Sequence, residues 1–252
     1  MKSGFDISRI EGDGYLILPL SMSRLATGQS PEFCYEVIEN FAKKLETFGN
    51  DIILLYTNGL YFNSEEVSFE NRKKTTQQAL NHIYAMRNLV EKKKQFIPGA
   101  IHYLPIDFVI FNSEVFKDCV EKLKKLEEED EKFREMLVAN SRDRQYTEAN
   151  MNFLIEEIVV AHILRQKLVE LPRTLVKTDS WRLLAYPGVP LSSDIYQWQK
   201  GILPKKEDIN PYSGAQYNLE TKQLIIFDEA LIVADEAPQM IDENTIDPTI
   251  RT

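Results

Sequence analysis

Short apolar runs alternate along the sequence with longer segments of helical periodicity, and this alternation restricts the possible folds more than any other feature. The apolar runs predict buried strands at Tyr15–Leu20, Ile52–Tyr56, Ala100–Leu104 and Leu183–Tyr186. The segments between and after them predict helices over about Pro31–Phe48, Phe69–Gln95, Ser113–Asn140, Thr147–Val169 and Asp194–Lys200. A hairpin or an edge strand is predicted at Tyr217–Phe227. This order favours an α/β protein with a Rossmann-like three-layer fold and a mostly parallel sheet.

The length and composition suit a single folded domain. With 252 residues, of which 43% are apolar and 27% charged, the chain can bury a sizeable core. We expect one Rossmann-like domain over residues 1–234, followed by an acidic, disordered tail over residues 235–252.

The sequence shows no signal for export or for a membrane. No apolar run approaches the roughly 20 residues that span a bilayer, and the first residues, MKSGFDISRIEGDG, lack the apolar stretch of a secretory signal. Cys34 and Cys119 lie far apart in sequence and lack the spacing of a metal site. We therefore expect a cytoplasmic protein that does not enter a membrane.

The charge is distributed unevenly. The net charge of −9 argues against nonspecific binding to DNA, yet the segment Ser68–Gln95 holds seven basic and two acidic residues, a net charge of +5 that leaves −14 for the rest of the chain. Its basic residues are Arg72, Lys73, Lys74, Arg87, Lys92, Lys93 and Lys94. A solvated helix face would explain such a run, and so would contact with phosphates.

The usual cofactor motifs of a Rossmann-like fold are missing. A dinucleotide site needs a glycine-rich turn after the first strand, but the turn reads PLSMSRL and the first glycine after it is Gly28. A P-loop is absent, as are the HxGH and KMSKS signatures with which class I tRNA synthetases use ATP. His82, His102 and His162 do not form a metal motif. We therefore expect no cofactor and no metal.

Ser21 follows the first predicted strand, where ligands of open α/β sheets meet the chain. It could be a nucleophile that attacks an activated acyl group, a phosphate contact, or a helix cap. Other residues at strand ends or in the adjoining turns are candidate substrate contacts, namely Arg24, Pro19, Tyr56 and Pro187.

A second set of candidate residues lies on the helix predicted over Thr147–Val169. His162, Gln166 and Glu170 follow at intervals of four and would share one helix face. Glu170 precedes Leu171-Pro172, where the helix must end or kink. A carboxylate there could orient or deprotonate an amine, or it could be an ordinary surface acid.

Taken together, LPLSMSR, LLAYPG and Glu170-Leu171-Pro172 resemble the tRNA-dependent cyclodipeptide synthases. That family is similar to the catalytic domain of class I tyrosyl- and tryptophanyl-tRNA synthetases, and its members join the amino acids of two charged tRNAs into a diketopiperazine. The resemblance implies that Ser21 accepts the first aminoacyl group as an ester and that Glu170 holds its α-amino group. It also implies that the basic helix binds the tRNA acceptor arm. Tyr186-Pro187, together with Arg24 in place of an asparagine, matches the Tyr-Pro subgroup.

One position departs from the family pattern Tyr-x-x-x-Glu-x-Pro, because Gln166 stands where the proton-transferring tyrosine is expected. A rival register places Phe153 and Glu157 at these positions, again without the tyrosine. The acid/base step would then use His162 or a water, or the chain belongs to a divergent branch, such as the one that makes arginine-containing dipeptides.

Two other functions stay open at this stage. The chain could be a catalytically inactive relative that binds tRNA, or another Rossmann-like acyltransferase that uses a small acyl donor. For the enzyme we expect a monomer that uses two aminoacyl-tRNAs for each product.

Overall fold

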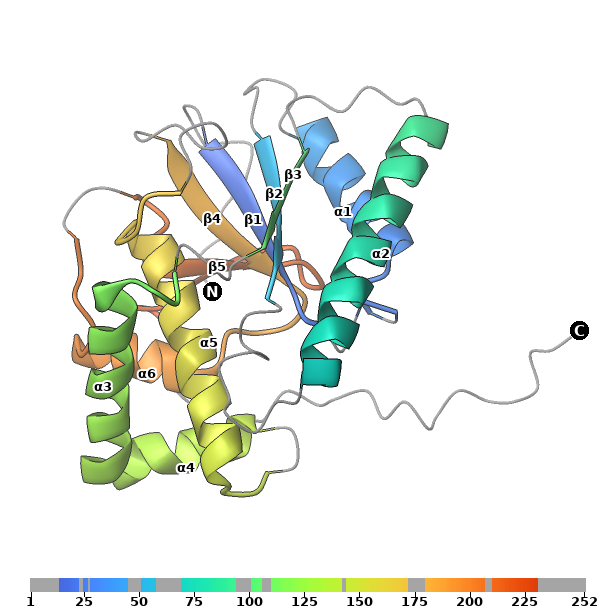
Figure 1. The fold of residues 1–252 in the computed structure, drawn as a ribbon. Helices are drawn as coiled ribbons and strands as arrows, with labels where there is room; N and C mark the ends of the chain where they lie inside the picture. The colour runs from blue at the N-terminus through green and yellow to red at the C-terminus, as the bar shows by residue number, and fades with distance from the viewer. Residues whose placement is uncertain are drawn as a thin grey trace, which may run out of the picture.

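The computed structural model describes residues 14–22, 25–26, 28–44, 51–57, 69–93, 101–105, 110–141, 144–171, 180–206 and 210–230, with backbone alone for residues 41–44 and 105. The strands are β1 (Gly14–Leu20), β2 (Asp51–Tyr56), β3 (Ile101–Pro105), β4 (Trp181–Tyr186), β5 (Ala215–Asn218) and β6 (Gln223–Ile226). They form one six-stranded sheet in the order β3-β2-β1-β4-β5-β6 (Figure 1). All neighbouring strands are parallel except β5 and β6, which pair as an antiparallel hairpin.

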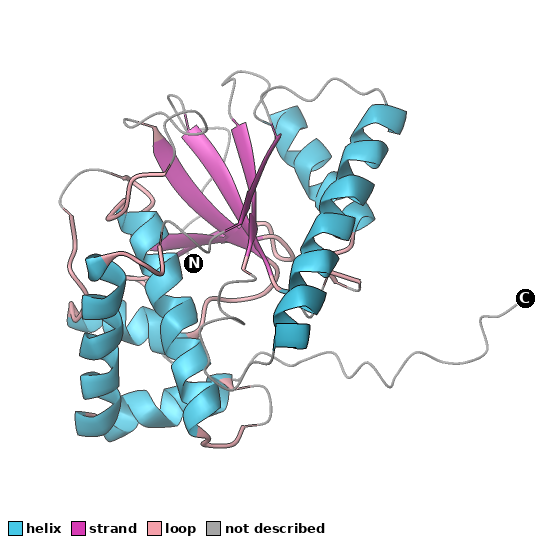
Figure 2. Ribbon diagram, in the orientation of Figure 1, coloured by secondary structure: helices cyan, strands magenta, loops and turns pink. Residues whose placement is uncertain are grey.

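Helices cover both faces of the sheet, as Figure 2 shows. One face is covered by α1 (Pro31–Lys44) and α2 (Phe69–Lys93). The other is covered by α3 (Glu114–Glu129), α4 (Glu131–Asn140), α5 (Glu148–Gln166) and α6 (Ser192–Lys200). The predicted α/β, Rossmann-like three-layer fold with a mostly parallel sheet is therefore confirmed.

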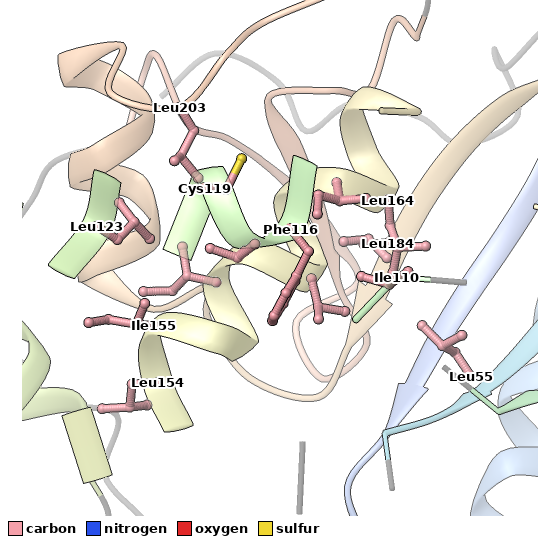
Figure 3. Close-up of a cluster of buried hydrophobic side chains, with 14 of the residues drawn as sticks. Leu55, Ile110, Phe116, Cys119, Leu123, Leu154, Ile155, Leu164, Leu184 and Leu203 are labelled. Atoms are coloured by element: carbon pink, nitrogen blue, oxygen red, sulfur yellow. The ribbon is translucent and has the colours of Figure 1, made fainter. Parts of the chain in front are cut away.

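The alternation of side chains along the strands separates two hydrophobic cores. In β1, Tyr15 and Ile17 belong to the core under α3, α4 and α5, part of which Figure 3 shows. Leu16, Leu18 and Leu20 belong to the core under α1 and α2. Because a parallel strand must be apolar on both faces, the continuous run GYLILPL is the pattern that this position requires.

Most predicted elements are confirmed to within a few residues, but the predicted single helix over Ser113–Asn140 is wrong. Asp130 leaves the helical conformation, with φ −120° and ψ 101°, and separates α3 from α4. Its carboxylate accepts the Phe133 N–H at 3.1 Å as the cap of α4 and the Tyr196 hydroxyl at 2.7 Å. The break could not be recognised in the acidic run EEEDEK, because the capping residue Asp130 stands there among other acidic residues.

The helix predicted over Thr147–Val169 also ends earlier than expected. Thr147 caps α5 by accepting the Asn150 N–H, and Lys167 terminates it in the left-handed conformation at φ 50°. Glu170 therefore lies beyond the helix, so the prediction that it shares one face with His162 and Gln166 is wrong.

The helices that the structure describes include none that combines the length and the apolarity needed to cross a membrane. The predicted acidic tail over residues 235–252 lies outside the described residues.

Candidate functional site

The sheet changes direction of winding next to β1, and this is where an open α/β sheet binds its ligands. The chain moves outward from β1 to β2 and β3, then returns to the other side of β1 with β4. β1 pairs with β2 through Leu20, but its pairing with β4 ends three residues earlier, at Ile17 and Leu184. The two strands therefore separate at their carboxyl ends, directly before Ser21.

Ser21 is half-buried at this edge, in a backbone that is held from both sides. Its N–H donates to Gln29 Oε1 at 2.7 Å. The preceding carbonyl, of Leu20, accepts the Thr57 hydroxyl at 2.8 Å and the Thr57 N–H at 3.2 Å. Ser21 caps no α-helix of the described chain, because α1 begins at Pro31 and its cap is Ser30, which accepts the Phe33 N–H.

Tyr186 ends β4 on the α5 side of the sheet. Leu184, two residues earlier, belongs to the core under α5, and alternation places Tyr186 on the same side. Leu20 and Met22 both pack under α1 and α2, so Ser21 between them is turned toward the α5 side as well. The structure thus brings Ser21 and Tyr186 to the same edge and the same face, with the buried Pro187 next in the chain.

The direction of α5 places Glu157 and Glu170 at different distances from the edge of the sheet that holds Ser21. Asn210 Nδ2 donates to the Arg165 carbonyl at 2.9 Å and to the Arg182 carbonyl at 2.7 Å. Arg182 is the second residue of β4, so the last turn of α5 lies at the amino edge of the sheet, opposite Ser21. Figure 1 shows α5 running antiparallel to the strands.

Glu157 and Phe153 therefore lie nearer to the edge of Ser21 than Gln166 and Glu170 do. At a rise of about 1.5 Å per residue, Glu157 is roughly 13 Å further along α5 toward the carboxyl edge than Gln166. Both Phe153 and Glu157 are partly buried. The structure does not bring Gln166 or Glu170 to Ser21.

His162 and Gln166 have structural partners at the amino edge. The His162 ring is buried, and its Nε2 donates to the Pro204 carbonyl at 2.9 Å. Burial, helped by the nearby Arg165 cation, lowers the pKa of His162 to about 4, so its imidazole is neutral near pH 7. Gln166 Oε1 accepts the Lys206 N–H at 2.7 Å. A proton relay from His162 to Ser21 is not supported by these positions.

Tyr56 lies at the same edge as Ser21 but faces the other way. Its side chain is fully buried under α1 and α2, and its hydroxyl binds His82 Nδ1 at 2.8 Å. A direct substrate contact of Tyr56 is therefore not supported. Pro19 is half-buried, and its carbonyl accepts from Gln29 Nε2 at 3.1 Å. Arg24 and Lys94 lie outside the described residues.

The described part of the chain has no His–Asp pair beside Ser21. His102 Nε2 lies 3.0 Å from Asp51 Oδ2, but Asp51 begins β2 and belongs to the amino edge. Both cysteines are buried, which raises the pKa of Cys34 to about 12 and that of Cys119 to about 11, so neither is a nucleophile near pH 7. Among the residues that the structure describes, no three His, Cys, Asp or Glu side chains gather as a metal site would require.

The basic residues of α2 form two groups. Arg72, Lys73 and Lys74 are exposed near the N-terminus of the helix, on the side of the carboxyl edge. Arg87, Lys92 and Lys93 lie roughly 20 to 30 Å further along, toward its C-terminus. The Arg87 guanidinium lies 5.2 Å from the Tyr103 ring centroid and the Lys93 amine 4.2 Å from that of Tyr35, so these two side chains of the second group contact aromatic rings of the protein itself.

The first basic group opposes the helix dipole. The N-terminus of a helix is its positive end, where cations are disfavoured and anions are bound. No ion pair joins Arg72, Lys73 or Lys74 to an acidic side chain within the described residues. An anion bound at this end of α2 would offset the repulsion between these three cations and the positive end of the helix dipole.

Sequence reasoning missed the exposed apolar side chains of the same helix. Phe69, Leu80 and Tyr84 are 76%, 42% and 61% exposed. Together with Lys73 they follow the positions i, i+4, i+11 and i+15, so they form one stripe along α2. Exposed aromatic rings beside cations are typical of surfaces on which bases of single-stranded RNA stack. The spacing was present in the sequence, but the buried side of α2 had to be known to show that this stripe faces outward.

No protein-family model matches the sequence, and no curated protein matches it at significant similarity. Solved structures do resemble it. A cyclodipeptide synthase (CDPS) from Bacillus thermoamylovorans is 15% identical, with a TM-score of 0.50 over 78% of this chain and 86% of that one. A CDPS from Staphylococcus haemolyticus is 12% identical, with a TM-score of 0.48 over 78% and 88%. A Mycobacterium tuberculosis protein, reported to show that cyclodipeptide synthetases are related to type I tRNA synthetases, is 12% identical, with a TM-score of 0.45 over 79% and 82%.

At 15% identity the first of these likenesses concerns the fold alone. The superposition covers most of both chains. The chain therefore has the fold of a cyclodipeptide synthase, a Rossmann-like α/β fold.

Proposed function

We propose that this chain is a tRNA-dependent cyclodipeptide synthase that uses Ser21 as a covalent nucleophile. The observation on which the proposal rests is the meeting of three features at one edge of the sheet. These are the nucleophile candidate Ser21 after β1, the hydroxyl of Tyr186 at the end of β4, and the exposed cations of the first turns of α2. A small-molecule acyltransferase would need the first two features but not the third.

The reaction needs no nucleotide, because the ester of an aminoacyl-tRNA is already activated. In the first step the Ser21 Oγ attacks the ester carbonyl, and the bond from this carbon to the ribose oxygen breaks. The Oγ proton passes to that ribose oxygen, through the Tyr186 hydroxyl or a ribose hydroxyl. The product is an aminoacyl ester on Ser21 and a free tRNA.

A second aminoacyl-tRNA then supplies the other residue. Its α-amine attacks the ester carbonyl, forming a peptide bond and returning the proton to Ser21 Oγ. The terminal amine of this dipeptidyl-tRNA attacks the remaining ester, which closes the diketopiperazine and releases the second tRNA. Each step exchanges one acyl bond for another, so no oxidant, metal or cofactor enters the balance.

We propose Glu157, rather than Glu170, as the carboxylate that holds the α-amino group. Glu157 lies on the half of α5 nearer to Ser21, whereas Glu170 is exposed beyond the end of the helix at the opposite edge. Phe153, one turn before Glu157, takes the place of the family tyrosine and cannot transfer a proton. Among the described residues, Tyr186 is then the phenol on the α5 side of this edge that we propose for proton transfer.

A pair of substitutions separates the two glutamates. Glu157→Gln is expected to lower product formation about 100-fold, because the carboxylate that binds or deprotonates the amine is lost. Glu170→Gln is expected to leave the rate within about twofold, as at other surface positions. Initial rates of diketopiperazine formation with saturating charged tRNA measure both. A larger loss with Glu170→Gln would restore the register in which Gln166 replaces the tyrosine.

The remaining assignments follow from the same proposal. Tyr186-Pro187 and Arg24 favour the Tyr-Pro subgroup, and we propose a monomer with one domain over residues 1–234. A reaction that consumes charged tRNA takes place where tRNA is charged, so the cytoplasm is the proposed location.

The first test is the product itself. The chain would be expressed in a bacterial host, and the culture medium compared by mass spectrometry with that of the same host carrying an empty vector. A cyclic dipeptide found only with the chain supports the proposal and identifies both amino acids. If there is none, purified protein incubated with a mixture of charged tRNAs must show the mass of an aminoacyl ester on Ser21. The absence of both would leave an inactive tRNA-binding relative, and the affinity for tRNA would test that.

A further inference from the structure

Gln29 makes a contact with the backbone around Ser21 that a neighbouring strand would normally make. Its side chain is fully buried. Oε1 accepts the Ser21 N–H at 2.7 Å, and Nε2 donates to the Pro19 carbonyl at 3.1 Å. In a β-ladder, one residue of the partner strand binds an N–H and a C=O two residues apart in this way.

The position of this contact explains why a side chain is needed. β4 pairs with β1 only as far as Leu184 and Ile17, so beyond this point the β4 side of β1 loses its strand partner. The Pro19 carbonyl and the Ser21 N–H point to that side, whereas the Leu20 carbonyl points to β2 and binds Thr57. Gln29 thus continues the ladder where the two strands separate, and it does so with a neutral group that both donates and accepts.

Gln29 is itself fixed from the opposite side. Its backbone carbonyl accepts from His82 Nε2 at 3.0 Å and from the Cys34 thiol at 3.5 Å. Because a carbonyl can only accept, Nε2 of His82 holds the proton, and Nδ1 accepts from the Tyr56 hydroxyl at 2.8 Å. Burial lowers the pKa of His82 and raises that of Tyr56, so both groups stay neutral. The chain Tyr56–His82–Gln29–Ser21 connects β2 and α2 to the candidate nucleophile.

We propose that Gln29 is a positioning residue for Ser21, and that His82 and Tyr56 in turn position Gln29. Neither His82 nor Tyr56 faces the substrate side of the sheet, so both act through Gln29. The catalytic part of this inference rests on the proposed function. The structural part, that Gln29 fixes the Ser21 backbone, does not.

Three variants test the connection. Gln29→Met keeps the volume of the side chain and removes both of its hydrogen bonds. Gln29→Glu keeps an acceptor for the Ser21 N–H but loses the donor to the Pro19 carbonyl. Tyr56→Phe removes the hydroxyl that is three hydrogen bonds away from Ser21, through His82 and Gln29. The matched control is Gln197→Met, which removes a buried glutamine on α6 that donates a hydrogen bond to Asp194 at 3.0 Å.

Three quantities are measured for each folded variant. Amide hydrogen exchange of Ser21, followed by NMR, reports the backbone hydrogen bond whether or not the protein is active. Single-turnover formation of the Ser21 ester from charged tRNA reports catalysis, and the Kd for uncharged tRNA reports binding.

We expect Gln29→Met to accelerate exchange of the Ser21 amide at least roughly 10-fold. The same variant should slow ester formation about 10- to 100-fold, with the Kd for tRNA unchanged. Gln29→Glu and Tyr56→Phe should show the same pattern to a smaller degree, and Gln197→Met should show neither effect.

Unchanged exchange and unchanged ester formation in Gln29→Met would overturn the inference, as would a loss of tRNA affinity equal to the loss of rate. If the wild type forms no ester at all, the proposed function fails. The exchange of the Ser21 amide then decides the structural part alone, because it needs no substrate.

Discussion

Replacing Ser21 by alanine is expected to lower diketopiperazine formation by more than about 1,000-fold, because the covalent intermediate can no longer form. The substitution removes one oxygen at a half-buried position and leaves the backbone bonds of residues 20 and 21 in place. The melting temperature and the affinity for tRNA should therefore stay close to the wild-type values. Mass spectrometry of the culture medium measures the loss of the diketopiperazine. Mass spectrometry of the protein after incubation with charged tRNA measures the loss of the aminoacyl ester on residue 21.

Ser21→Cys is the matched variant for this experiment. A thiol preserves the nucleophile at nearly the same size, so an aminoacyl thioester should still form on residue 21 even if later steps are slow. Product from Ser21→Ala at a rate near that of the wild type would rule out the covalent mechanism. A second nucleophile or direct attack of one aminoacyl-tRNA on the other would then have to be considered.

Reversing the three charges near the start of α2, as Arg72→Glu, Lys73→Glu and Lys74→Glu together, is expected to raise the KM for aminoacyl-tRNA roughly 100-fold. If each residue contacts one phosphate, the slope of log affinity against log salt concentration should fall by about 3. The rate of ester formation at saturating tRNA should change much less, since these side chains do not touch the reacting atoms.

The melting temperature shows whether Arg72, Lys73 and Lys74 bind tRNA or instead stabilise the fold. Glutamates near the N-terminus of a helix are favoured by its dipole, by about 0.3–1 kcal/mol each, so the melting temperature should stay the same or rise. The control is the reversal of Lys117, Lys122 and Lys124 on α3, which are equally exposed and change the net charge by the same amount. Equal losses of tRNA affinity in both variants would indicate an effect of net charge. They would contradict the proposal that α2 binds tRNA.

The fold could be predicted from the sequence because its strands and helices are locally consistent. Apolar runs such as ILLY in β2 can be stable only with both faces covered, and the Ser30-Pro31 start of α1 is a strong local signal. The position of Ser21 at the carboxyl edge follows from the strand that precedes it. Tyr186 follows in the same way from β4.

The rest of the candidate site depends on contacts between distant residues. The register on α5 could not be chosen from spacing, because Phe153–Glu157 and Gln166–Glu170 repeat the same interval. Tertiary contacts, such as the bonds of Asn210 to Arg165 and Arg182, place the helix against β4. Tyr56 was expected near the substrate because it ends a strand, but the pleat turns it to the other face. Gln29 showed no signal at all, since a glutamine before a helix cap is unremarkable until its side chain is seen between two separating strands.

Because the Ser21 N–H is donated to Gln29 Oε1, this bond competes with its donation to the carbonyl oxygen of an attacked ester. In many serine enzymes the N–H of the nucleophile is one of the donors that stabilise the oxyanion of the tetrahedral intermediate. Here the Ser21 N–H binds Gln29 instead, and this bond fixes the backbone of the candidate nucleophile. In the proposed reaction such a site suits acyl groups that are already activated, as the ester of a charged tRNA is. The same bond that holds the serine in place would thus disfavour attack of Ser21 on the peptide bonds of the proposed diketopiperazine.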